Sequence, residues 1–229
     1  MATGAETSGD ADAQLFDRMA RELYVAVIAD ILDGLGHRQQ VMDAAIRPVL
    51  PDPAQVVVGR AATLLVAPQY ERPEQPYTEQ IAAIDALRPG DVPVIGTGAL
   101  TSAAVWGELF SNAARGRGAR GLVTDGYHRD TRMLLELGFP VFSAGARPFD
   151  IAGRATVISH GRPVACGGVL VHPGDLLFAE TDGIAVIPRA AAAEVVERAF
   201  VKAATEDQAR DDLRAGALLG DVWRTYRVL

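Results

Sequence analysis

The stretch that decides the fold is VPVIGTGALTSAAVWGELFSNAARGRGARGLVTDGYHRDTRMLLELGFPVFS, residues 92–143. Three short apolar segments in it are typical of buried strands, and the two segments between them have helical character. The predicted strands are 92–95, 121–125 and 139–143, and the predicted helices are 101–115, capped by Thr101 or Ser102, and 130–137. This β-α-β-α-β order predicts an α/β layer whose strands are parallel.

The flanking segments add further elements to this layer. Before it, residues 15–36 carry apolar side chains at helical spacing and predict one helix that ends at two glycines, and residues 56–66 predict a buried strand. A short helix is expected over 78–88. After the layer, short β segments separated by Gly and Pro turns run from 155 to 188, and the Ala- and charge-rich stretch 189–215 predicts a long helix.

These elements divide the sequence into three parts. The acidic, small-residue-rich residues 1–14 are expected to be a disordered tail, and residues 15–188 are expected to form one α/β domain. Residues 189–229 are expected to form a C-terminal helical extension that ends in a second helix or a packed tail. The extension either docks on a neighbouring subunit or packs on its own domain.

The composition excludes several classes of protein. The 229-residue chain is 49% hydrophobic and 22% charged, so it can bury a substantial core. Its formal net charge of −7 argues against non-specific nucleic-acid binding, which needs Lys and Arg to displace phosphate counterions. The single cysteine, Cys166, excludes an internal disulfide framework and a zinc site with several thiolates, and we expect it to be an inert core thiol.

The sequence contains neither a recognisable targeting segment nor a membrane span. The N-terminal residues lack the basic and apolar regions of a signal peptide. The longest uncharged run, between Asp91 and Glu108, is too short to cross a bilayer and contains a proline and three glycines. We therefore expect a cytoplasmic protein that has neither a membrane nor a nucleic acid as partner.

Arg129 and Asp130 are the first candidates for chemistry. They follow the predicted strand 121–125 and open the next helix, so they lie where the ligand crevice of α/β sheets usually forms. Arg129 offers a planar fork for a carboxylate or phosphate, and Asp130 offers hard oxygen ligands for Mg²⁺ or Mn²⁺. The alternative is that Asp130 only caps the helix and that Arg129 is a surface residue.

A second candidate is the turn Gly96-Thr97-Gly98 together with Trp106-Gly107-Glu108-Leu109. Glycines let a backbone approach a ligand closely, and free amides bind anions. Glu108 is a candidate metal-shell carboxylate or, alternatively, a solvated acid on a helix face. The turn lacks the third glycine of a dinucleotide fingerprint. None of the four histidines has metal-ligand spacing, and His128 is the only one beside the Arg-Asp pair.

Together these motifs resemble the RraA-like family, which includes the 4-hydroxy-4-methyl-2-oxoglutarate / 4-carboxy-4-hydroxy-2-oxoadipate aldolases. The family motif is an acidic residue, twenty residues and then Arg-Asp, and Glu108 followed by Arg129-Asp130 has this spacing. Some aldolases carry Asp where this sequence carries Glu108, which changes the reach of the carboxylate toward a metal. The resemblance spans roughly residues 25–188. Further matching segments are Ile28-Ala29-Asp30-Ile31-Leu32-Asp33, Arg47-Pro48, Gly59-Arg60-Ala61, Gly167-Gly168-Val169, Pro173-Gly174-Asp175, Glu180-Thr181-Asp182-Gly183 and Ile187-Pro188.

The resemblance implies a compact α/β sandwich with a swivelling β/β/α-type core and a long C-terminal helical extension. It also implies a homotrimer or hexamer with the site between subunits and the extension at that interface. By the same resemblance, Asp130 holds Mg²⁺ or Mn²⁺ largely through waters, and Glu108 orients those waters. A carboxylate from the helical extension of a neighbouring subunit completes the site, and Glu206 is the candidate, with Asp207 and Asp211 as alternatives.

For the substrate, the resemblance implies that Arg129 anchors the carboxylate and keto oxygen of a pyruvyl group, helped by the loop Trp106-Gly107-Glu108-Leu109. The implied activity is that of a class II, metal-dependent aldolase that forms pyruvate from a 4-hydroxy-2-oxo diacid. Oxaloacetate decarboxylation would use the same enolate. Segments 68–80 and 144–150 and the tail of a neighbour are expected to recognise the distal end of the substrate.

Two other functions remain open within the family. Some members bind and inhibit an endoribonuclease without being enzymes, but these are shorter and lack the C-terminal extension. An enzyme with other 2-oxo-acid or hydroxy-acid lyase chemistry is the third alternative. Some members have been labelled menaquinone methyltransferases, and we discount that activity because the sequence has no glycine-rich S-adenosylmethionine loop with a downstream ribose acid.

Overall fold

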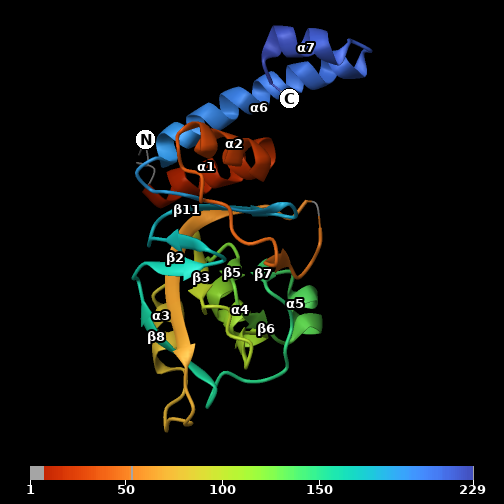
Figure 1. Ribbon diagram of the computed structural model, residues 1–229. Helices are drawn as coiled ribbons and strands as arrows, with labels where there is room; N and C mark the ends of the chain where they lie inside the picture. The colour runs from red at the N-terminus through yellow and green to blue at the C-terminus, as the bar shows by residue number, and fades with distance from the viewer. Residues whose placement is uncertain (1–7, 53, 229) are drawn as a thin grey trace, which may run out of the picture.

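β2 (Val57–Pro68) is the strand around which the rest of the fold is arranged (Figure 1). The computed structural model describes residues 8–52 and 54–228. On one edge β2 pairs in parallel with β3 (Asp91–Gly96). On its other edge it pairs antiparallel first with β11 (Leu176–Glu180) and then with β8 (Ala155–His160). Most of its side chains are buried, as expected for a strand with neighbours on both edges.

The predicted parallel layer extends from β3. Next to it lie β5 (Leu122–Thr124) and then β7 (Val141–Ser143), both parallel, which confirms the parallel pairing expected from the β-α-β-α-β pattern. The edges of the eight-stranded sheet are β1 (Arg47–Pro48), antiparallel to β7, and β12 (Gly183–Ile187), antiparallel to β11. The expected α/β fold is thereby confirmed.

The helix expected over 101–115 is shorter and begins later. Ala104–Trp106 form β4, which pairs in parallel with β6 (Tyr127–His128), and α4 (Glu108–Gly116) follows with Gly107 as its N-cap. The prediction of Thr101 or Ser102 as the cap is therefore wrong. The reason is that residues 103–106 are four consecutive buried residues, and a strand paired with β6 satisfies their backbone groups better than an amphipathic helix would.

Two further short helices lie beside α4. α3 (Thr78–Asp85) and α5 (Thr131–Leu137) occupy the expected positions, and with α4 they pack around the fully buried Trp106 on one face of the sheet. Each begins after a residue in the left-handed region, Tyr77 for α3 with φ 73° and Asp130 for α5 with φ 62°. Non-glycine residues rarely adopt this conformation, and such strain concentrates at functional sites.

The N-terminal segment differs from the prediction in two ways. Helix α1 (Ser8–Glu22) includes residues 8–14, which were expected to be disordered, because Asp12 receives two hydrogen bonds from Arg60 at 2.7 and 2.8 Å and Phe16 is buried. Residues 1–7 of the expected tail lie outside the described residues. The single helix expected over 15–36 is interrupted, and α2 (Val25–Gly34) starts anew where the N–H of Val25 donates to Oε1 of Glu180 at 2.7 Å.

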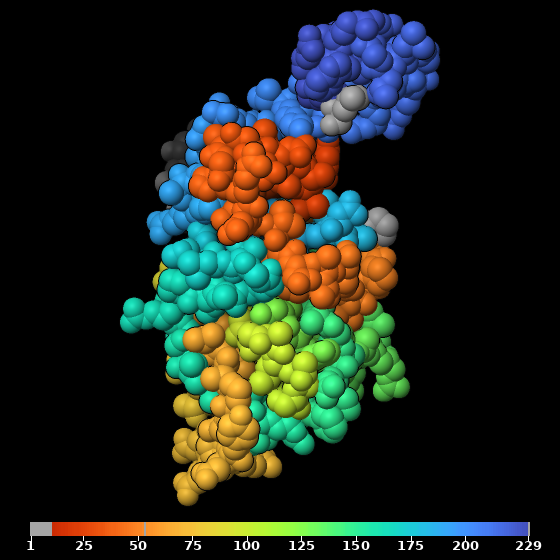
Figure 2. Space-filling model, in the orientation of Figure 1, coloured from red at the N-terminus to blue at the C-terminus, as the bar shows by residue number. Residues whose placement is uncertain are grey.

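The C-terminal part contains a hairpin and the long helix. β9 (Val164–Cys166) and β10 (Val169–Val171) pair antiparallel and cover the face of the sheet opposite to α3, α4 and α5, with Cys166 buried as expected. α6 (Ala192–Arg214) packs on α2, and its last part projects from the body together with α7 (Leu219–Tyr226) (Figures 1 and 2). The expected long C-terminal helix is confirmed. No helix formed by residues 8–52 and 54–228 is long and apolar enough to cross a membrane.

Candidate functional site

The candidate site forms where two neighbouring parallel strands end. β4 leads into Gly107 and the start of α4, and β6 leads into Arg129 and Asp130 before α5. The N–H of Arg129 donates to the carbonyl of Trp106 at 2.9 Å, so the two strand ends are joined at this point. Residues separated by about twenty positions in the sequence therefore meet because β4 and β6 pair in parallel.

Asp130 is directed at the start of α4 rather than at its own helix. Its side chain makes no capping hydrogen bond to α5, and Oδ2 instead accepts the N–H of Glu108 at 3.2 Å. Gly107 makes this approach possible, because a Cβ at that position would lie 2.6 Å from Oδ2 of Asp130 and 3.1 Å from Cγ of Arg129. Asp130 therefore occupies the N-cap position of α5, as the alternative expected, but its side chain does not cap that helix.

Arg129 lies between two carboxylates. Its Nε is 3.7 Å from Oδ2 of Asp130, and its Nη1 is 3.8 Å from Oδ1 of Asp150. Both distances exceed a normal hydrogen bond, so these contacts hold the guanidinium electrostatically and leave its N–H donors free to bind a ligand. Its side chain is 36% exposed, which makes these donors accessible.

Asp150 is in turn held by Tyr77, whose hydroxyl donates to Oδ2 at 2.5 Å. Burial alone would raise the pKa of Asp150, but the hydrogen bonds from Tyr77 and from backbone N–H groups, with the nearby Arg129, lower the pKa below its ordinary value. The same hydrogen bond raises the pKa of the Tyr77 hydroxyl. Asp150 is thus a carboxylate and Tyr77 a neutral phenol at physiological pH.

Two cavities of similar size flank the Arg129–Asp130 pair. One, which we call the apolar cavity, has a volume of about 290 Å³ and includes Tyr77, Asp150 and mostly hydrophobic side chains. The other, the arginine cavity, has a volume of about 320 Å³ and is lined mainly by Arg147 and polar groups. Apart from Tyr77, Asp150, Arg129 and Asp130, the apolar cavity is lined by Ile81, Ala104, Val105, Trp106, Gly107, Leu109, Phe110 and Ile151. Besides Arg147, the arginine cavity is lined by Arg129, Asp130, Thr131, Ala146 and Pro148.

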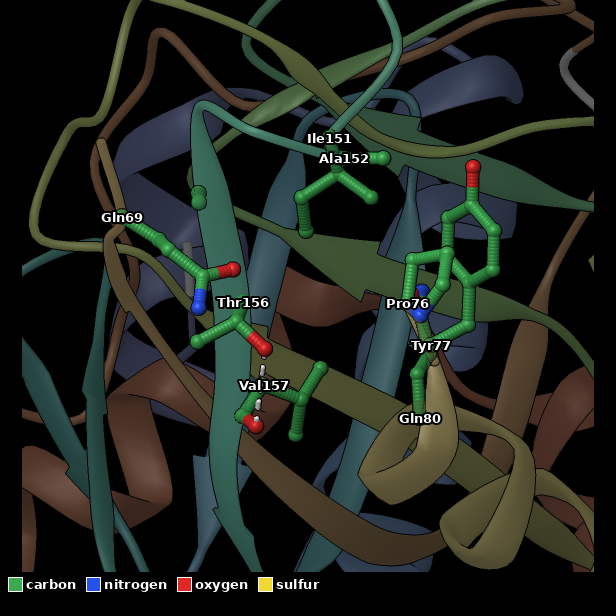
Figure 3. A pocket seen from close by; sticks show the side chains of 9 residues that line it. Gln69, Pro76, Tyr77, Gln80, Ile151, Ala152, Thr156 and Val157 are labelled. Atoms are coloured by element: carbon green, nitrogen blue, oxygen red, sulfur yellow. Dashed lines mark hydrogen bonds between the residues drawn. The ribbon is translucent and has the colours of Figure 1, made fainter. Parts of the chain in front are cut away.

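Other hollows in the protein are less suited to a substrate. Behind Tyr77 lies a cavity of about 10 Å³, bounded by Gln69 and Thr156 on the strand side and by Pro76 and Tyr77 at the start of α3 (Figure 3). Its volume fits about one water molecule. A wider cavity of about 670 Å³ lies between α1 and α6, but its Arg60 is already paired with Asp12.

The structure brings together most of the residues predicted for the site. Trp106, Gly107, Leu109, Arg129 and Asp130 all line the apolar cavity, with Leu109 76% exposed at its edge and Trp106 buried in its wall. The side chain of Glu108 lines neither cavity, because its Oε1 accepts a hydrogen bond from Asn112 one turn along α4. Only the backbone N–H of Glu108 faces Asp130.

Glu206 lies far from this site within one chain. It is on α6, beyond β11 from the site (Figure 1), and its Oε1 is 3.5 Å from Nζ of Lys202, which also contacts Asp30 of α2. Burial raises the pKa of Glu206. Its alternatives Asp207 and Asp211 pair with arginines on the same helix. A role for any of them at the site therefore requires a second subunit.

Tyr77 and Asp150 are site residues that no motif singled out. Both lie in segments expected to recognise the distal end of a substrate, 68–80 and 144–150. Their contact joins positions 73 residues apart, so only the folded chain brings them together. The sequence indicated the two segments but carried no signal for these two residues.

The carboxylates of the site suit one kind of cation. Among the described residues, no group of three His, Cys, Asp or Glu side chains is arranged to hold a metal, so the site is no zinc-type cage. Mg²⁺ usually keeps several waters and is held by one or two carboxylates, and Asp130, with Asp150 lining the same cavity, fits that pattern. His128 is not available as a ligand, because both of its ring nitrogens are already engaged, one with the hydroxyl of Ser143 at 2.7 Å and the other with that of Thr131 at 3.0 Å.

Comparison with known proteins places the chain in a family. The model of the RraA-like family, described as Aldolase/RraA, matches residues 25–186. A Halalkalibacterium halodurans protein named "Putative 4-hydroxy-4-methyl-2-oxoglutarate aldolase" is 33% identical over 195 residues, 83% of this chain and 84% of that protein. A similarly named protein of Shewanella oneidensis is 28% identical over 100 residues, 42% of this chain and 58% of that protein.

Solved structures share the fold. Streptomyces coelicolor RraAS2, described as an unusual member of the RNase ES inhibitor RraA protein family, has a TM-score of 0.77 and 30% identity. That alignment covers 86% of this chain and 96% of RraAS2. An uncharacterized protein from Pseudomonas syringae pv. tomato has a TM-score of 0.78 and 27% identity, covering 92% of this chain and 96% of its own.

Proposed function

Because the chain belongs to the Aldolase/RraA family, we propose that it is a divalent-metal-dependent lyase that releases pyruvate from a 4-hydroxy-2-oxo diacid. Oxaloacetate decarboxylation is proposed as a second reaction of the same site. The observation that carries the proposal is the pair formed by Arg129 and Asp130. A guanidinium with free donors and a carboxylate suited to Mg²⁺ lie side by side at the edge of a cavity of substrate size.

Arg129 is assigned to the pyruvyl end of the substrate. Its planar fork can pair with the 1-carboxylate while one N–H points at the 2-keto oxygen. The first turn of α4 adds donors, because helix geometry leaves the amides of Leu109 and Phe110 without an acceptor within the helix. These groups would hold the substrate so that its distal end extends into the flanking cavities.

The cleavage is a retro-aldol reaction. A proton leaves the C4 hydroxyl, the C3–C4 bond breaks, and its electron pair moves toward C2, so that negative charge grows on the keto oxygen. Protonation at C3 then gives pyruvate, and the C4 fragment leaves as a carbonyl compound. Arg129 stabilises the charge on the keto oxygen, and we assign the proton transfer to a water held near Arg129.

Asp130 is the residue assigned to hold Mg²⁺ or Mn²⁺. When bound, such a cation would polarise the keto oxygen as a Lewis acid. The N–H of Glu108 holds Oδ2 of Asp130 in place. Oδ1 is then the oxygen that we assign to the cation. The proposed part of Glu108 in orienting waters requires its side chain to release Asn112.

We propose that the active protein is a homotrimer or hexamer in which α6 of a neighbouring subunit completes the site, with Glu206 as its carboxylate. The projecting end of α6 and α7 supports this. Its hydrophobic residues Leu218, Leu219 and Trp223 are exposed in the single chain, as expected for a segment that packs on another subunit.

The rival function is that of a regulator that binds a ribonuclease. The similarity to RraAS2 favours it, because that protein is described as a member of an RNase inhibitor family. The arrangement of Arg129, Asp130 and Gly107 around a cavity favours the enzyme, since binding a large protein partner does not need it. An assay of pyruvate release distinguishes the enzyme from the regulator.

The test is pyruvate release measured through lactate dehydrogenase. Oxaloacetate and a panel of 4-hydroxy-2-oxo diacids are supplied with Mg²⁺, with Mn²⁺ and with EDTA. The proposal expects metal-dependent pyruvate release from at least one diacid, abolished by EDTA. Absence of pyruvate from every substrate, together with binding to a ribonuclease, supports the regulator instead.

A further inference from the structure

Arg147 is fixed beside the candidate site by its backbone. Its N–H donates to the carbonyl of His128 at 2.8 Å, and the preceding Ala146 forms a parallel bridge with His128. His128 immediately precedes Arg129 in the chain. The position of Arg147 is therefore set relative to the Arg129–Asp130 pair by β6, the strand that leads directly into that pair.

The side chain of Arg147 is oriented by an aromatic ring. Its guanidinium carbon lies 5.4 Å from the ring centroid of Tyr127. Gly145, with φ 141°, approaches the same ring so closely that a Cβ there would lie 3.3 Å from Cε1 of Tyr127. Arg147 forms no ion pair with any side chain in residues 8–52 or 54–228, so its charge is stacked but not neutralised.

The two cavities differ in charge. The arginine cavity contains Arg129 and Arg147 against the single carboxylate of Asp130. The apolar cavity contains Arg129 against two carboxylates, Asp130 and Asp150, and is otherwise hydrophobic. A second carboxylate of a substrate anchored at Arg129 would therefore be attracted into the arginine cavity and repelled by Asp150 in the apolar one.

We propose that Arg147 is the specificity residue that binds the second carboxylate of a dicarboxylate 2-oxo acid, while the apolar cavity accepts an uncharged substituent on C4. This inference rests on the proposed function, because it takes Arg129 as the anchor of the first carboxylate. A bidentate guanidinium suits this task, and its stacking on Tyr127 limits the rotamer freedom that binding would otherwise remove.

The test uses two unreactive ligands that differ in one group. 2-Oxoglutarate has the second carboxylate at C5 but lacks the C4 hydroxyl needed for cleavage, and 2-oxopentanoate replaces that carboxylate with a methyl group. Calorimetric dissociation constants are measured for both ligands with the full chain and Mg²⁺. The variants are Arg147→Gln, Arg147→Lys and, as a control with the same change in charge, Arg132→Gln, whose side chain is 85% exposed and outside both cavities.

The wild type is expected to bind 2-oxoglutarate about tenfold to a hundredfold more tightly than 2-oxopentanoate, the range for one hydrogen-bonded charge pair. Arg147→Gln should remove that preference by weakening the binding of 2-oxoglutarate and leaving the binding of 2-oxopentanoate unchanged. Arg147→Lys should retain part of the preference, and Arg132→Gln should keep all of it. A wild type without the preference, or an Arg147→Gln variant that keeps it, overturns the inference.

Failure of the proposed function has a different signature. A protein that prefers 2-oxoglutarate through Arg147 but releases no pyruvate from any 4-hydroxy-2-oxo diacid retains the binding inference and loses the aldolase. A protein that releases pyruvate and shows equal loss on diacid and monoacid substrates in Arg147→Gln retains the aldolase and loses the inference.

Discussion

Oδ2 of Asp130 accepts the backbone N–H of Glu108 at 3.2 Å, so the carboxylate at the start of α5 caps α4, the helix before it in the sequence. This single hydrogen bond joins both halves of the acidic residue–Arg–Asp motif. It uses the main chain of Glu108 rather than its side chain, which explains how the motif can keep its geometry when the acidic residue differs in length. The carboxylate of Asp130 therefore has two tasks, a structural one and the proposed binding of a cation.

Asp130→Asn separates the two tasks. The amide oxygen of Asn can still accept the N–H of Glu108, but the charge that attracts Mg²⁺ is lost. We expect a large loss of kcat/KM that excess Mg²⁺ only partly restores, with little change in Tm. Titrations of activity against Mg²⁺, beside thermal unfolding, measure both. Full activity of the variant in EDTA would show that Asp130 does not hold a metal.

Gly107→Ala tests the close approach of α4 to the Arg-Asp pair. The new Cβ would lie 2.6 Å from Oδ2 of Asp130, so the carboxylate or the helix must shift. We expect a loss of stability of about 1–3 kcal/mol, as for overpacking, and a larger loss of activity than of stability. Denaturant unfolding and the pyruvate assay measure the two.

Gly116→Ala is the matched control on the same helix. A Cβ at Gly116 would meet no atom within 4 Å, and alanine favours a helix over glycine. Stability should stay unchanged or rise by up to about 1 kcal/mol, with full activity. An equal effect of both substitutions would mean that the contact at Gly107 has no special importance.

The parts of the fold that were predictable depend on local pattern. The apolar runs of β3, β5 and β7 and the helices between them are visible within fifty residues of sequence, and their order alone implies parallel pairing. Arg129 and Asp130 could be recognised because they follow such a strand, at the edge where ligands usually bind.

The parts that were missed depend on partners far away in the sequence. α2 begins at Val25 because Glu180, 155 positions later, accepts its N–H. β4 is a strand rather than part of a helix because it pairs with β6. Tyr77 and Asp150 are linked across 73 positions. No spacing rule encodes these contacts, so the sequence indicated only the segments in which Tyr77 and Asp150 lie.

Tyr77→Phe should change how the free energy of unfolding depends on pH, compared with the wild type. The variant removes the hydrogen bond that lowers the pKa of Asp150, so this pKa rises toward or above its usual value. A carboxylate with a lowered folded-state pKa stabilises the fold above its unfolded pKa of about 3.9, and this contribution disappears as pH falls through the folded-state value.

The wild type should therefore be more stable than Tyr77→Phe at neutral pH, by about 1 kcal/mol for a partly exposed hydrogen bond, and the difference should shrink below about pH 4. Urea unfolding at a series of pH values measures this difference. A gap between the two proteins that stays constant from neutral to acid pH would assign the effect of Tyr77 to packing instead.

Assembly is tested by light scattering across a dilution series. If α6 and α7 of one subunit complete the site of the next, the protein should be a trimer or hexamer, and specific activity should fall where dilution produces monomers. Trp223→Asp places a charge on the exposed apolar surface of α7 and should shift the equilibrium toward monomer without unfolding the domain. A fully active monomer contradicts the shared site.

Arg129→Lys is the sharpest test of the enzyme. Lysine keeps the positive charge beside Asp130 and Asp150 but not the fork that can hold the substrate carboxylate and direct an N–H at the keto oxygen. We expect kcat/KM to fall on the order of a hundredfold or more, as for loss of a preorganised donor to a developing oxyanion, and Arg129→Ala to fall further. Oligomeric state and Tm should be unchanged in both, since the side chain is partly exposed and its ion pairs are long. If the wild type is active and Arg129→Lys stays within a few-fold of it, the aldolase stands, and the stabilisation of the keto oxygen must come from another group, with the amides at the start of α4 as the next candidates.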